Sequence, residues 1–224
     1  MTRWLYLSIA LTVIAIIGTL YAFYGMSDRF PDPVPTHWNI KGEADQYTPK
    51  EKVLPYLILT PGIMVLFLGL TVALPYLSPK QFSVDSFRDI YGYIMALAIG
   101  LMGLIQVAIV LGSMEIFLAK AKYIVAGLML FFALMGNVMG KVRRNFWMGV
   151  RTPWTLANDN VWNMTHRLTG WLWVGFGLLG LVLVLVIPGE SILIVCSVGL
   201  LVVVFYPVLY SLILYKRLER EGKL

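Results

Sequence analysis

Long apolar runs separated by short polar connections dominate the pattern of this chain. Six runs stand out, at residues 4–24, 54–77, 90–112, 123–139, 168–187 and 191–215. A helix of about 20 residues crosses a hydrocarbon core roughly 30 Å thick, because each residue adds about 1.5 Å. The run 123–139 is at the lower limit of that length. The pattern predicts an all-α, polytopic membrane protein with six transmembrane helices.

Composition supports this fold class. The 224 residues are 59% hydrophobic and 13% charged, with a mean hydropathy of +0.78, whereas soluble domains carry about 25% charged residues. Few residues remain outside the runs for a separate soluble domain. The single cysteine, Cys196, lies within an apolar run and excludes an intrachain disulfide. The first run is longer than a signal-peptide core and lacks a small-residue cleavage site, so we interpret it as a retained helix.

Charge predicts the orientation. Six spans place both termini on one side, and a cytoplasmic N-terminus gives the inner segments twelve of the 18 Lys and Arg residues. This bias follows the positive-inside rule, so we expect an N-in/C-in topology. The loop 25–53 is then external and the segment 140–167 cytoplasmic. The net charge of +6 reflects orientation and does not indicate nucleic-acid binding.

The external loop is rich in proline, which excludes a long helix there. His37 lies near Asp32, Glu43 and Asp45, but one histidine without cysteine or a paired histidine does not indicate a metal site. We expect a compact turn, fixed by the prolines and Gly42, over the outer helix ends.

The segment 145–167 contains three of the seven tryptophans and one of the two histidines. Gly149 permits an unusual backbone dihedral or a close approach, and Pro153 predicts a turn. Asn158 is a good N-cap for a helix that runs into the fifth span. On that helix Trp162 and His166 fall on one face together with Thr169.

Two interpretations of this segment stay open. In the first, Arg151, His166 and Arg167 converge on an anionic or carbonyl partner. In the second, the groups satisfy each other: Arg151 pairs with Asp159 or caps helix carbonyls, His166 stacks on Trp162, and Trp154 anchors at the interface. The nearby basic residues Lys141, Arg143 and Arg144 most simply attract anionic membrane lipid.

Polar residues inside the spans are few. Gln106 most simply forms an interhelical hydrogen bond, and Ala96 with Gly100 permits close helix contact. An alternative function is a small transporter or flippase. Its path would be lined by Gln106, Asn137 and the helices bent at Pro61 and Pro207. Against this alternative, the apolar runs of the chain contain no carboxylate, and the sequence shows no internal repeat. A membrane enzyme using His166 and Arg151 is a further alternative, but the chain shows no nucleophile elbow, phosphate-binding glycine loop or paired-histidine site. We therefore expect no enzyme, cofactor or metal.

Two motifs resemble a known family. Gly136-Asn137, Asn145-Phe146, the run Gly149-Val150-Arg151-Thr152-Pro153-Trp154-Thr155-Leu156, Val161-Trp162 and Thr165-His166-Arg167 are similar to the signature of the SdpI immunity family. The external run Pro35-Thr36-His37-Trp38-Asn39 with Gly42, Asp45 and Lys50 resembles a short uncharacterised domain that often precedes that family's core.

The resemblance implies a bacterial membrane protein that protects its cell from a secreted hydrophobic peptide, the sporulation-delaying toxin. It also implies that some members hold a cytosolic helix-turn-helix repressor at the membrane. We expect two units, residues 1–77 with the external loop and residues 78–224 with the cytoplasmic signature segment (residues 140–167).

The positions carried over from the resemblance are candidate binding or signature residues, not catalytic ones. In the signature segment they are Asn145, Gly149, Arg151, Thr152, Pro153, Trp154, Thr155, Trp162, Thr165 and His166. In the external loop they are Pro35, His37, Asn39 and Gly42.

Overall fold

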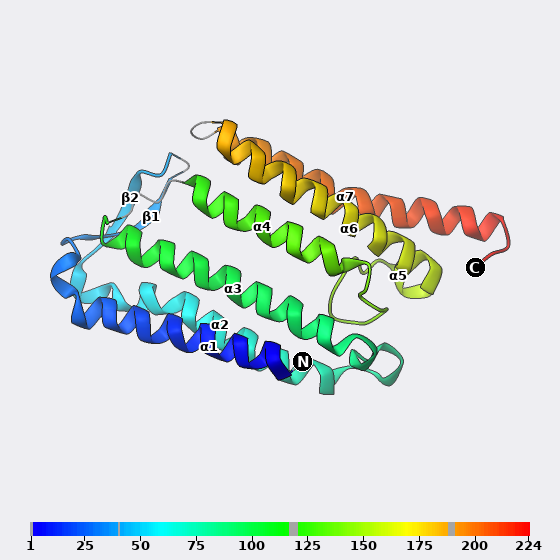
Figure 1. Ribbon diagram of the computed structural model, residues 1–224, viewed down its shortest axis with the longest axis horizontal. Coiled ribbons are helices and arrows are strands. Elements are labelled where there is room, and N and C mark those ends of the chain that lie inside the picture. Colours follow the sequence, from blue (N-terminus) through cyan, green and yellow to red (C-terminus); the bar gives the residue numbers. More distant parts are fainter. Residues whose placement is uncertain (1, 40, 117–120, 188–190) are drawn as a thin grey trace.

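The computed structural model describes residues 2–39, 41–116, 121–187 and 191–224 (Figure 1). These residues form six long helices and one short one. The long helices are α1 (Thr2–Leu20), α2 (Leu54–Leu77), α3 (Arg88–Ser113), α4 (Ala121–Met139), α6 (Asp159–Val186) and α7 (Ser191–Arg220), and the short one is α5 (Pro153–Ala157).

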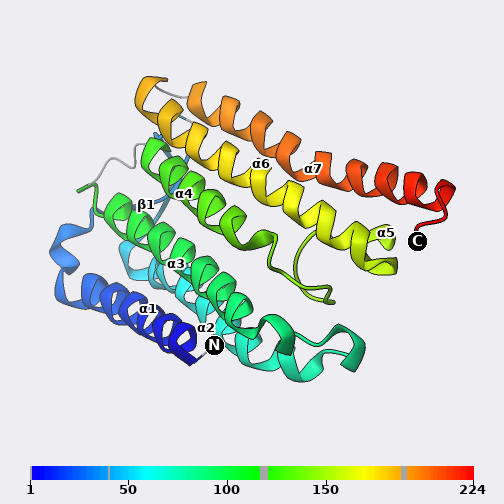
Figure 2. The same cartoon turned by 45° about the vertical axis from the view of Figure 1, so that its right-hand side comes forward.

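The long helices lie side by side as a bundle. Figures 1 and 2 show α1 and α2 beside α3 on one side, α6 and α7 on the other, and α4 between α3 and α6. Both chain termini and the signature segment lie at one end, which we call the signature end. The other end carries two short strands, and we call it the hairpin end.

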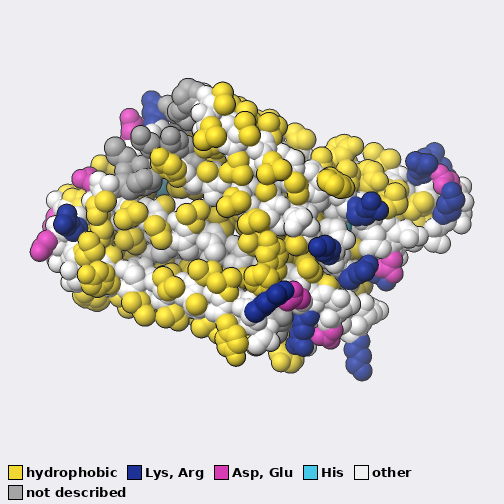
Figure 3. All heavy atoms as spheres, viewed as in Figure 1, with side chains coloured by type: hydrophobic (Ala, Val, Ile, Leu, Met, Phe, Trp, Pro, Cys, Tyr) yellow, Lys and Arg dark blue, Asp and Glu magenta, His cyan; other side chains and the backbone are white. Residues whose placement is uncertain are grey.

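The outer surface of the bundle is apolar. Hydrophobic side chains cover most of the face seen in Figure 3, while most visible Lys and Arg side chains lie toward the signature end. Among the described residues, five helices are long and apolar enough to cross a membrane, and the apolar stretch Tyr123–Met139 of α4 is shorter. The predicted class, a helical membrane protein, is confirmed.

Most helix bounds agree with the apolar pattern, and the differences have local causes. The predicted second span, residues 54–77, coincides with α2. α1 ends in a π-helical turn, η1 (Tyr21–Gly25). α7 continues five residues past the predicted end at 215, because its charged last turn is helical: Lys216 pairs with Glu219, and Arg217 with Glu221. Lys223 and Arg217 lower the pKa of Glu221 to about 2. The turn expected at 188–190 lies outside the described residues.

The loop 25–53 contains an antiparallel β-hairpin that the sequence pattern did not predict. Strands β1 (Val34–Trp38) and β2 (Ala44–Thr48) pair. The connecting turn is compact, as expected, because Oδ1 of Asn39 accepts hydrogen bonds from the backbone N–H groups of Lys41 and Glu43 at 2.8 and 3.1 Å. Gly42 has a φ of +80°, which glycine adopts without strain.

The hairpin is attached to the end of α3. The Ser113 hydroxyl donates to the Pro35 carbonyl at 3.0 Å. The Trp38 ring packs on Gly112, where an added Cβ would lie 2.9 Å from a ring carbon. These two contacts hold the hairpin over the bundle.

The closest helix contact joins α4 and α6. An added Cβ on Gly136 would lie 2.6 Å from the Val174 nitrogen, and one on Gly177 would lie 2.5 Å from backbone atoms of α4. Small residues permit this approach of two backbones. The close contact that we expected at Gly100 is not present, since a Cβ there would meet only the Leu11 side chain at 3.9 Å.

Gln106 forms the interhelical hydrogen bonds expected of it. Its Nε2 donates to Thr19 Oγ1 of α1 and to the Leu57 carbonyl of α2, both at 2.8 Å. The residue is buried and joins three helices.

Candidate functional site

Asn145 fixes the conformation of the first half of the signature segment. Its Nδ2 donates to the carbonyls of Arg143 and Met148, at 2.9 and 3.0 Å. Its Oδ1 accepts from the N–H groups of Trp147 and Met148, at 2.8 and 2.9 Å. The side chain is fully buried, and its amide forms hydrogen bonds with the surrounding backbone rather than with a ligand.

Two stacked rings on α6, those of Trp162 and His166, hold the first half of the segment in place. The His166 ring lies parallel to the Trp162 ring, with centroids 4.0 Å apart and an interplanar angle of 18°. Trp162 Nε1 donates to the Val142 carbonyl at 2.8 Å. The Val150 N–H donates to His166 Nε2 at 3.0 Å, so Nδ1 carries the proton and donates to the Trp162 carbonyl at 2.8 Å. Both imidazole nitrogens are therefore occupied.

Gly149 makes that histidine contact possible. Its φ is +105°, and an added Cβ would lie 2.2 Å from His166 Nε2. Both properties that the sequence suggested for this glycine, an unusual dihedral and a close approach, are confirmed.

The start of α5 is a capping box linked to α7. Thr152 accepts from the Thr155 N–H, and the Thr155 hydroxyl in turn accepts from the Thr152 N–H. The Thr152 hydroxyl also lies 3.0 Å from that of Ser211 in α7. Pro153 occupies the first helical turn, where its missing N–H is harmless, rather than forming a separate turn. Trp154, beside it, is half-buried.

The ion pair between Arg151 and Asp159, one option of the second interpretation, does not form. Asp159 pairs with Arg144, whose Nε lies 2.9 Å from Oδ1. Arg144 Nη1 also donates to the Leu156 carbonyl at 2.8 Å, and the guanidinium lies over the Phe82 ring. Arg144 thus ties the segment to α5, α6 and the α2–α3 connection.

The first interpretation, a convergence of Arg151, His166 and Arg167, is contradicted by their positions. Arg151 is exposed, donates to the Phe146 carbonyl and lines a cavity. Arg167 is exposed and lines a different cleft, next to Gly140. His166 is buried between its two backbone partners, so the stacking alternative is confirmed for this residue. A membrane enzyme that uses His166 and Arg151 together has no support in this geometry.

The segment covers an apolar cavity of about 300 Å³. Its walls come from α3, α4, α6 and α7, and the segment itself contributes Val142 and residues 148–152. Three methionines lie in the walls, namely Met135, Met139 and Met148. Methionine adapts its shape to irregular apolar partners. Arg151 is the charged residue among those that line the cavity, and the Thr152 and Thr169 side chains add the other polar groups.

Some contributors were not singled out from the sequence. Met135 and Met139 fall at i and i+4 and so share one face of α4, which is a signal that could have marked them. Trp147 Nε1 donates to the Ser78 hydroxyl at 2.7 Å. These two residues are 69 positions apart, so no local sequence pattern predicts their contact. Thr165 is buried, and its hydroxyl has no hydrogen-bond partner among the described residues.

The candidates in the loop 25–53 do not join this site, because they lie in the hairpin at the other end of the bundle. His37 Nδ1 lies 2.6 Å from Asp45 Oδ1 across the two strands, and both side chains are exposed. Pro35 contributes its carbonyl to α3, and Asn39 with Gly42 forms the turn. Within the described residues no group of three His, Cys, Asp or Glu side chains could hold a metal.

Gln106 and Asn137, which the transport alternative placed on one path, line different clefts of the described part of the chain. Gln106 lines a cleft between α1 and α3, whereas Asn137 lines the cleft beside Arg167. No lining residue is common to the two clefts.

Comparisons with known proteins define the class of this bundle. Residues 141–211 match the SdpI/YfhL protein family, and residues 11–65 match a domain of unknown function, DUF1648. The resemblance inferred from the two motifs is thereby confirmed, and the protein is a multi-pass cell membrane protein that carries the SdpI/YfhL region.

A particular relative is the immunity protein SdpI of Bacillus subtilis (strain 168), which is 32% identical to this chain over 93 residues. The aligned part covers 42% of this chain and 44% of that protein, so it spans less than half of the relative's length. No solved structure matches the chain.

Proposed function

We propose that this protein protects the cell membrane against a secreted apolar peptide, and that the peptide binds in the cavity beneath the signature segment. The likeness to an immunity protein supports the first part. The cavity supports the second part: three methionines line it, most of its lining residues fall within the matched region, and one guanidinium is among its lining groups.

The chemistry of the cavity suits an apolar peptide with one polar group. Apolar side chains of the peptide would contact Met139, Val204 and their neighbours, which provides affinity without directional bonds. The Arg151 guanidinium would donate to a peptide carboxylate or carbonyl, since its planar fork matches such oxygen acceptors. His166 and Asn145 would position the segment without touching the ligand.

We further propose that the exposed part of the segment docks a cytosolic helix-turn-helix repressor. Phe146, Arg151 and Pro153 are exposed on a segment whose backbone is hydrogen-bonded to the buried side chains of Asn145 and His166. A ligand that displaces the Arg151 contact with the Phe146 carbonyl would change this surface. Binding in the cavity and docking outside it would then be coupled through one side chain.

The topology that accompanies this function is a six-span one with both termini and the signature segment in the cytoplasm. α4 would be the span that completes the six. It is shorter than the other five but packs at close range against α6. We keep the division into units 1–77 and 78–224 as part of the proposal. The external hairpin would then be the first part of the protein that a secreted peptide meets.

Arg151→Ala tests the role of the guanidinium. Cells lacking their own immunity protein would express wild type or variant and be challenged with the purified sporulation-delaying peptide. Loss of a charged hydrogen bond costs about 1.5–3 kcal/mol. The highest peptide concentration that the cells survive should therefore fall about tenfold or more. Arg143→Ala is the control, because this exposed arginine lies in the same segment but does not line the cavity. Unchanged protection by Arg151→Ala at equal membrane level would refute the assigned role.

Filling the cavity tests the binding place separately. Val204→Phe adds a ring to a residue that lines the cavity, and Val202→Phe adds the same ring to an outward-facing neighbour on α7. We expect Val204→Phe alone to abolish protection, because the ring occupies the space meant for the peptide. Equal protection by both variants would place peptide binding elsewhere.

A further inference from the structure

A polar cleft of about 230 Å³ opens between α4 and α6 at the signature end, and we call it the α4–α6 cleft. Gly136 and Gly170 belong to its lining, and the two helix backbones meet there, since an added Cβ on Gly170 would lie 2.8 Å from the Gly136 carbonyl oxygen. Asn137 and Lys141 line the cleft from the α4 side, and Arg167 lines it from α6. The α4–α6 cleft shares no lining residue with the cavity beneath the signature segment.

The three polar side chains of this cleft have no partner within the described part of the chain. Lys141 and Arg167 form no ion pair there, and the Asn137 amide forms no hydrogen bond. All three residues are exposed. The described residues that line the cleft include no Asp or Glu. The cleft therefore presents two cations and an amide without a negative charge to balance them.

The end of α4 does not use these cations. Carbonyls at a helix C-terminus attract positive charge. Here the Val138 and Met139 carbonyls already accept from the next backbone N–H groups, at 2.9 and 3.1 Å. The Arg167 stem lies against Gly140, where an added Cβ would be 3.4 Å from Arg167 Cγ. The stem is thus packed, and the guanidinium is left for a group from outside the chain.

The outer face of α6 changes from charged to apolar at this cleft. Arg167, Trp171 and Leu178 fall at i, i+4 and i+11 and so share one face. Trp171 is 74% exposed and Leu178 is 55% exposed. A cation, then a tryptophan, then aliphatic side chains is the order in which a membrane helix passes from water through the headgroups into hydrocarbon. This order places Arg167 at the depth of the lipid headgroups.

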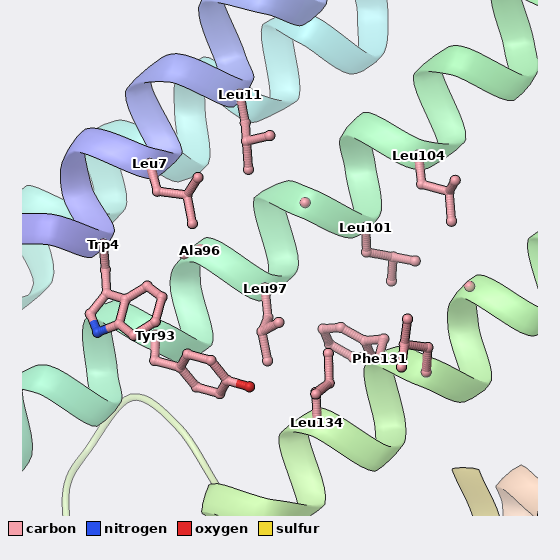
Figure 4. A pocket seen from close by; sticks show the side chains of 13 residues that line it. Trp4, Leu7, Leu11, Tyr93, Ala96, Leu97, Leu101, Leu104, Phe131 and Leu134 are labelled. Atoms are coloured by element: carbon pink, nitrogen blue, oxygen red, sulfur yellow. The ribbon is translucent and has the colours of Figure 1, made fainter. Parts of the chain in front are cut away.

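α4 shows the same change along one face. Leu134, Asn137 and Lys141 fall at i, i+3 and i+7. Figure 4 shows Leu134, the first of them, in the lining of an apolar cavity together with Leu97 and Phe131. The amide and the ammonium follow toward the signature end. Both helices therefore pass from apolar to cationic surface at the same cleft.

We propose that the α4–α6 cleft binds the phosphate of one anionic phospholipid, whose acyl chains lie on the apolar faces of α4 and α6. Lys141 and Arg167 donate to the phosphate oxygens from two sides, and the Asn137 amide donates to the phosphate or glycerol oxygens. A lipid with net negative charge fits better than a zwitterionic one, because the cleft has no carboxylate to pair with an amine. A soluble phosphate would leave the adjoining apolar surface without a partner.

This site differs from a general attraction of lipid to basic residues. Arg143 is exposed at the same end but does not line the cleft, and Arg144 is paired with Asp159. Lys141 and Arg167 lie at the two ends of the signature segment, so one phosphate would join the chain where it enters and leaves that segment. The proposal does not rest on peptide binding in the cavity beneath the segment.

Lipid titration of the purified full-length protein tests the site. Native mass spectrometry from a neutral detergent gives the Kd of the first bound lipid, for phosphatidylglycerol and for phosphatidylcholine with the same acyl chains. Lys141→Gln combined with Arg167→Gln removes both cations of the cleft. Arg143→Gln combined with Lys80→Gln is the matched control, because it removes two exposed cations that do not line the cleft.

We expect the wild-type protein to bind phosphatidylglycerol about 25-fold more tightly than phosphatidylcholine, because each of two cations near a membrane surface contributes about fivefold. The cleft double variant should bind both lipids alike, and the control double variant should keep the preference. Phosphatidylglycerol should also raise the unfolding temperature of the wild type more than phosphatidylcholine does, and this difference should vanish in the cleft double variant.

Gly140→Leu tests the cleft without changing its charge. The new side chain would meet the Arg167 stem, so the preference for phosphatidylglycerol should fall about fivefold, as for the loss of one cation. Gly175→Leu is the control, because an added Cβ on this α6 glycine would meet nothing within 4 Å and the residue does not line the cleft. Unfolding temperatures measured without added lipid verify that each variant folds.

Three results would overturn the proposal. Equal Kd values of the two lipids for the wild type would show that the cleft does not select an anion. An equal loss of preference in the two double variants would show that the basic surface acts as a whole. Displacement of phosphatidylglycerol by inorganic phosphate at matched ionic strength would identify a soluble phosphate as the occupant.

Discussion

At the scale of residues, the signature segment separates into side chains that build it and side chains that it presents. Asn145 and His166 are buried and use their polar atoms on the backbone of the segment itself. Arg151 is exposed and lines the cavity. In the structure, Asn145 and His166 therefore shape the signature segment, and Arg151 is the cationic residue that the segment presents to the cavity.

The amide of Asn145 provides a test of that separation. Asn145→Leu keeps the volume but leaves two N–H groups and two carbonyls without their partner. Unsatisfied buried groups cost about 1–3 kcal/mol each, less where water can enter, so we expect a loss of about 3 kcal/mol in the free energy of unfolding. Denaturant unfolding in detergent measures it. Asn137→Leu, at an exposed position, should change stability by less than about 0.5 kcal/mol.

Gly149 allows strain and collision to be distinguished. Gly149→Ala adds a Cβ at positive φ and 2.2 Å from His166 Nε2. Gly222→Ala adds one at a φ of +65° with nothing within 4 Å. The second substitution should cost only about 1 kcal/mol of backbone strain, and the first about 3 kcal/mol. Similar unfolding temperatures for the two variants would show that the histidine contact does not constrain position 149.

At the scale of elements, the α4–α6 pair carries the signature segment and fixes its geometry. Both helices lead directly into the segment, α4 at its start and α6 at its end. Their backbones meet at Gly136 and Gly177, so the position of one helix determines that of the other. Displacement of this pair should reach the segment through Trp162, which bonds to the Val142 carbonyl.

Gly177→Ala tests this coupling. The new methyl would lie 2.5 Å from backbone atoms of α4, which cannot yield as a side chain can. We expect α4 and α6 to separate, with a stability loss of about 2–3 kcal/mol and increased protease cleavage within residues 140–152. Gly175→Ala, two residues away with open space around its Cβ, is the matched control. Equal cleavage of both variants would show that the segment folds independently of the helix pair.

Elements were predictable from sequence where one local signal decided them. The apolar run at 54–77 and the cap at Asn158 act on their own neighbours, and both are confirmed. The hairpin was not predicted, because its two strands are short, contain a proline and several polar residues, and lack clear alternation. In the site, the Gly149 and His166 stacking predictions are confirmed. The choice of Arg144 rather than Arg151 as the partner of Asp159 depends on the path of the backbone, which residue spacing does not contain.

At the scale of the whole molecule, the six helices place two unlike surfaces at opposite ends of one bundle. At the hairpin end, Trp38 of β1 packs on Gly112 of α3 and Ser113 of α3 bonds to the Pro35 carbonyl. At the signature end, the segment contacts α6 and α7, and α4 packs against α6. The six-span proposal assigns these ends to opposite sides of the membrane. That assignment rests on the excess of Lys and Arg at the signature end.

Cysteine labelling in intact cells tests the assignment. In a Cys196→Ala background, Glu43→Cys places a thiol in the hairpin, and Arg143→Cys places one in the signature segment; residues 43 and 143 are exposed. A membrane-impermeant maleimide should label position 43 in intact cells and position 143 only after permeabilisation, because the charged reagent does not cross the hydrocarbon core. If α4 failed to span, the two positions would lie on the same side and label together. The reverse pattern would mean that the charge bias does not set the orientation of this bundle.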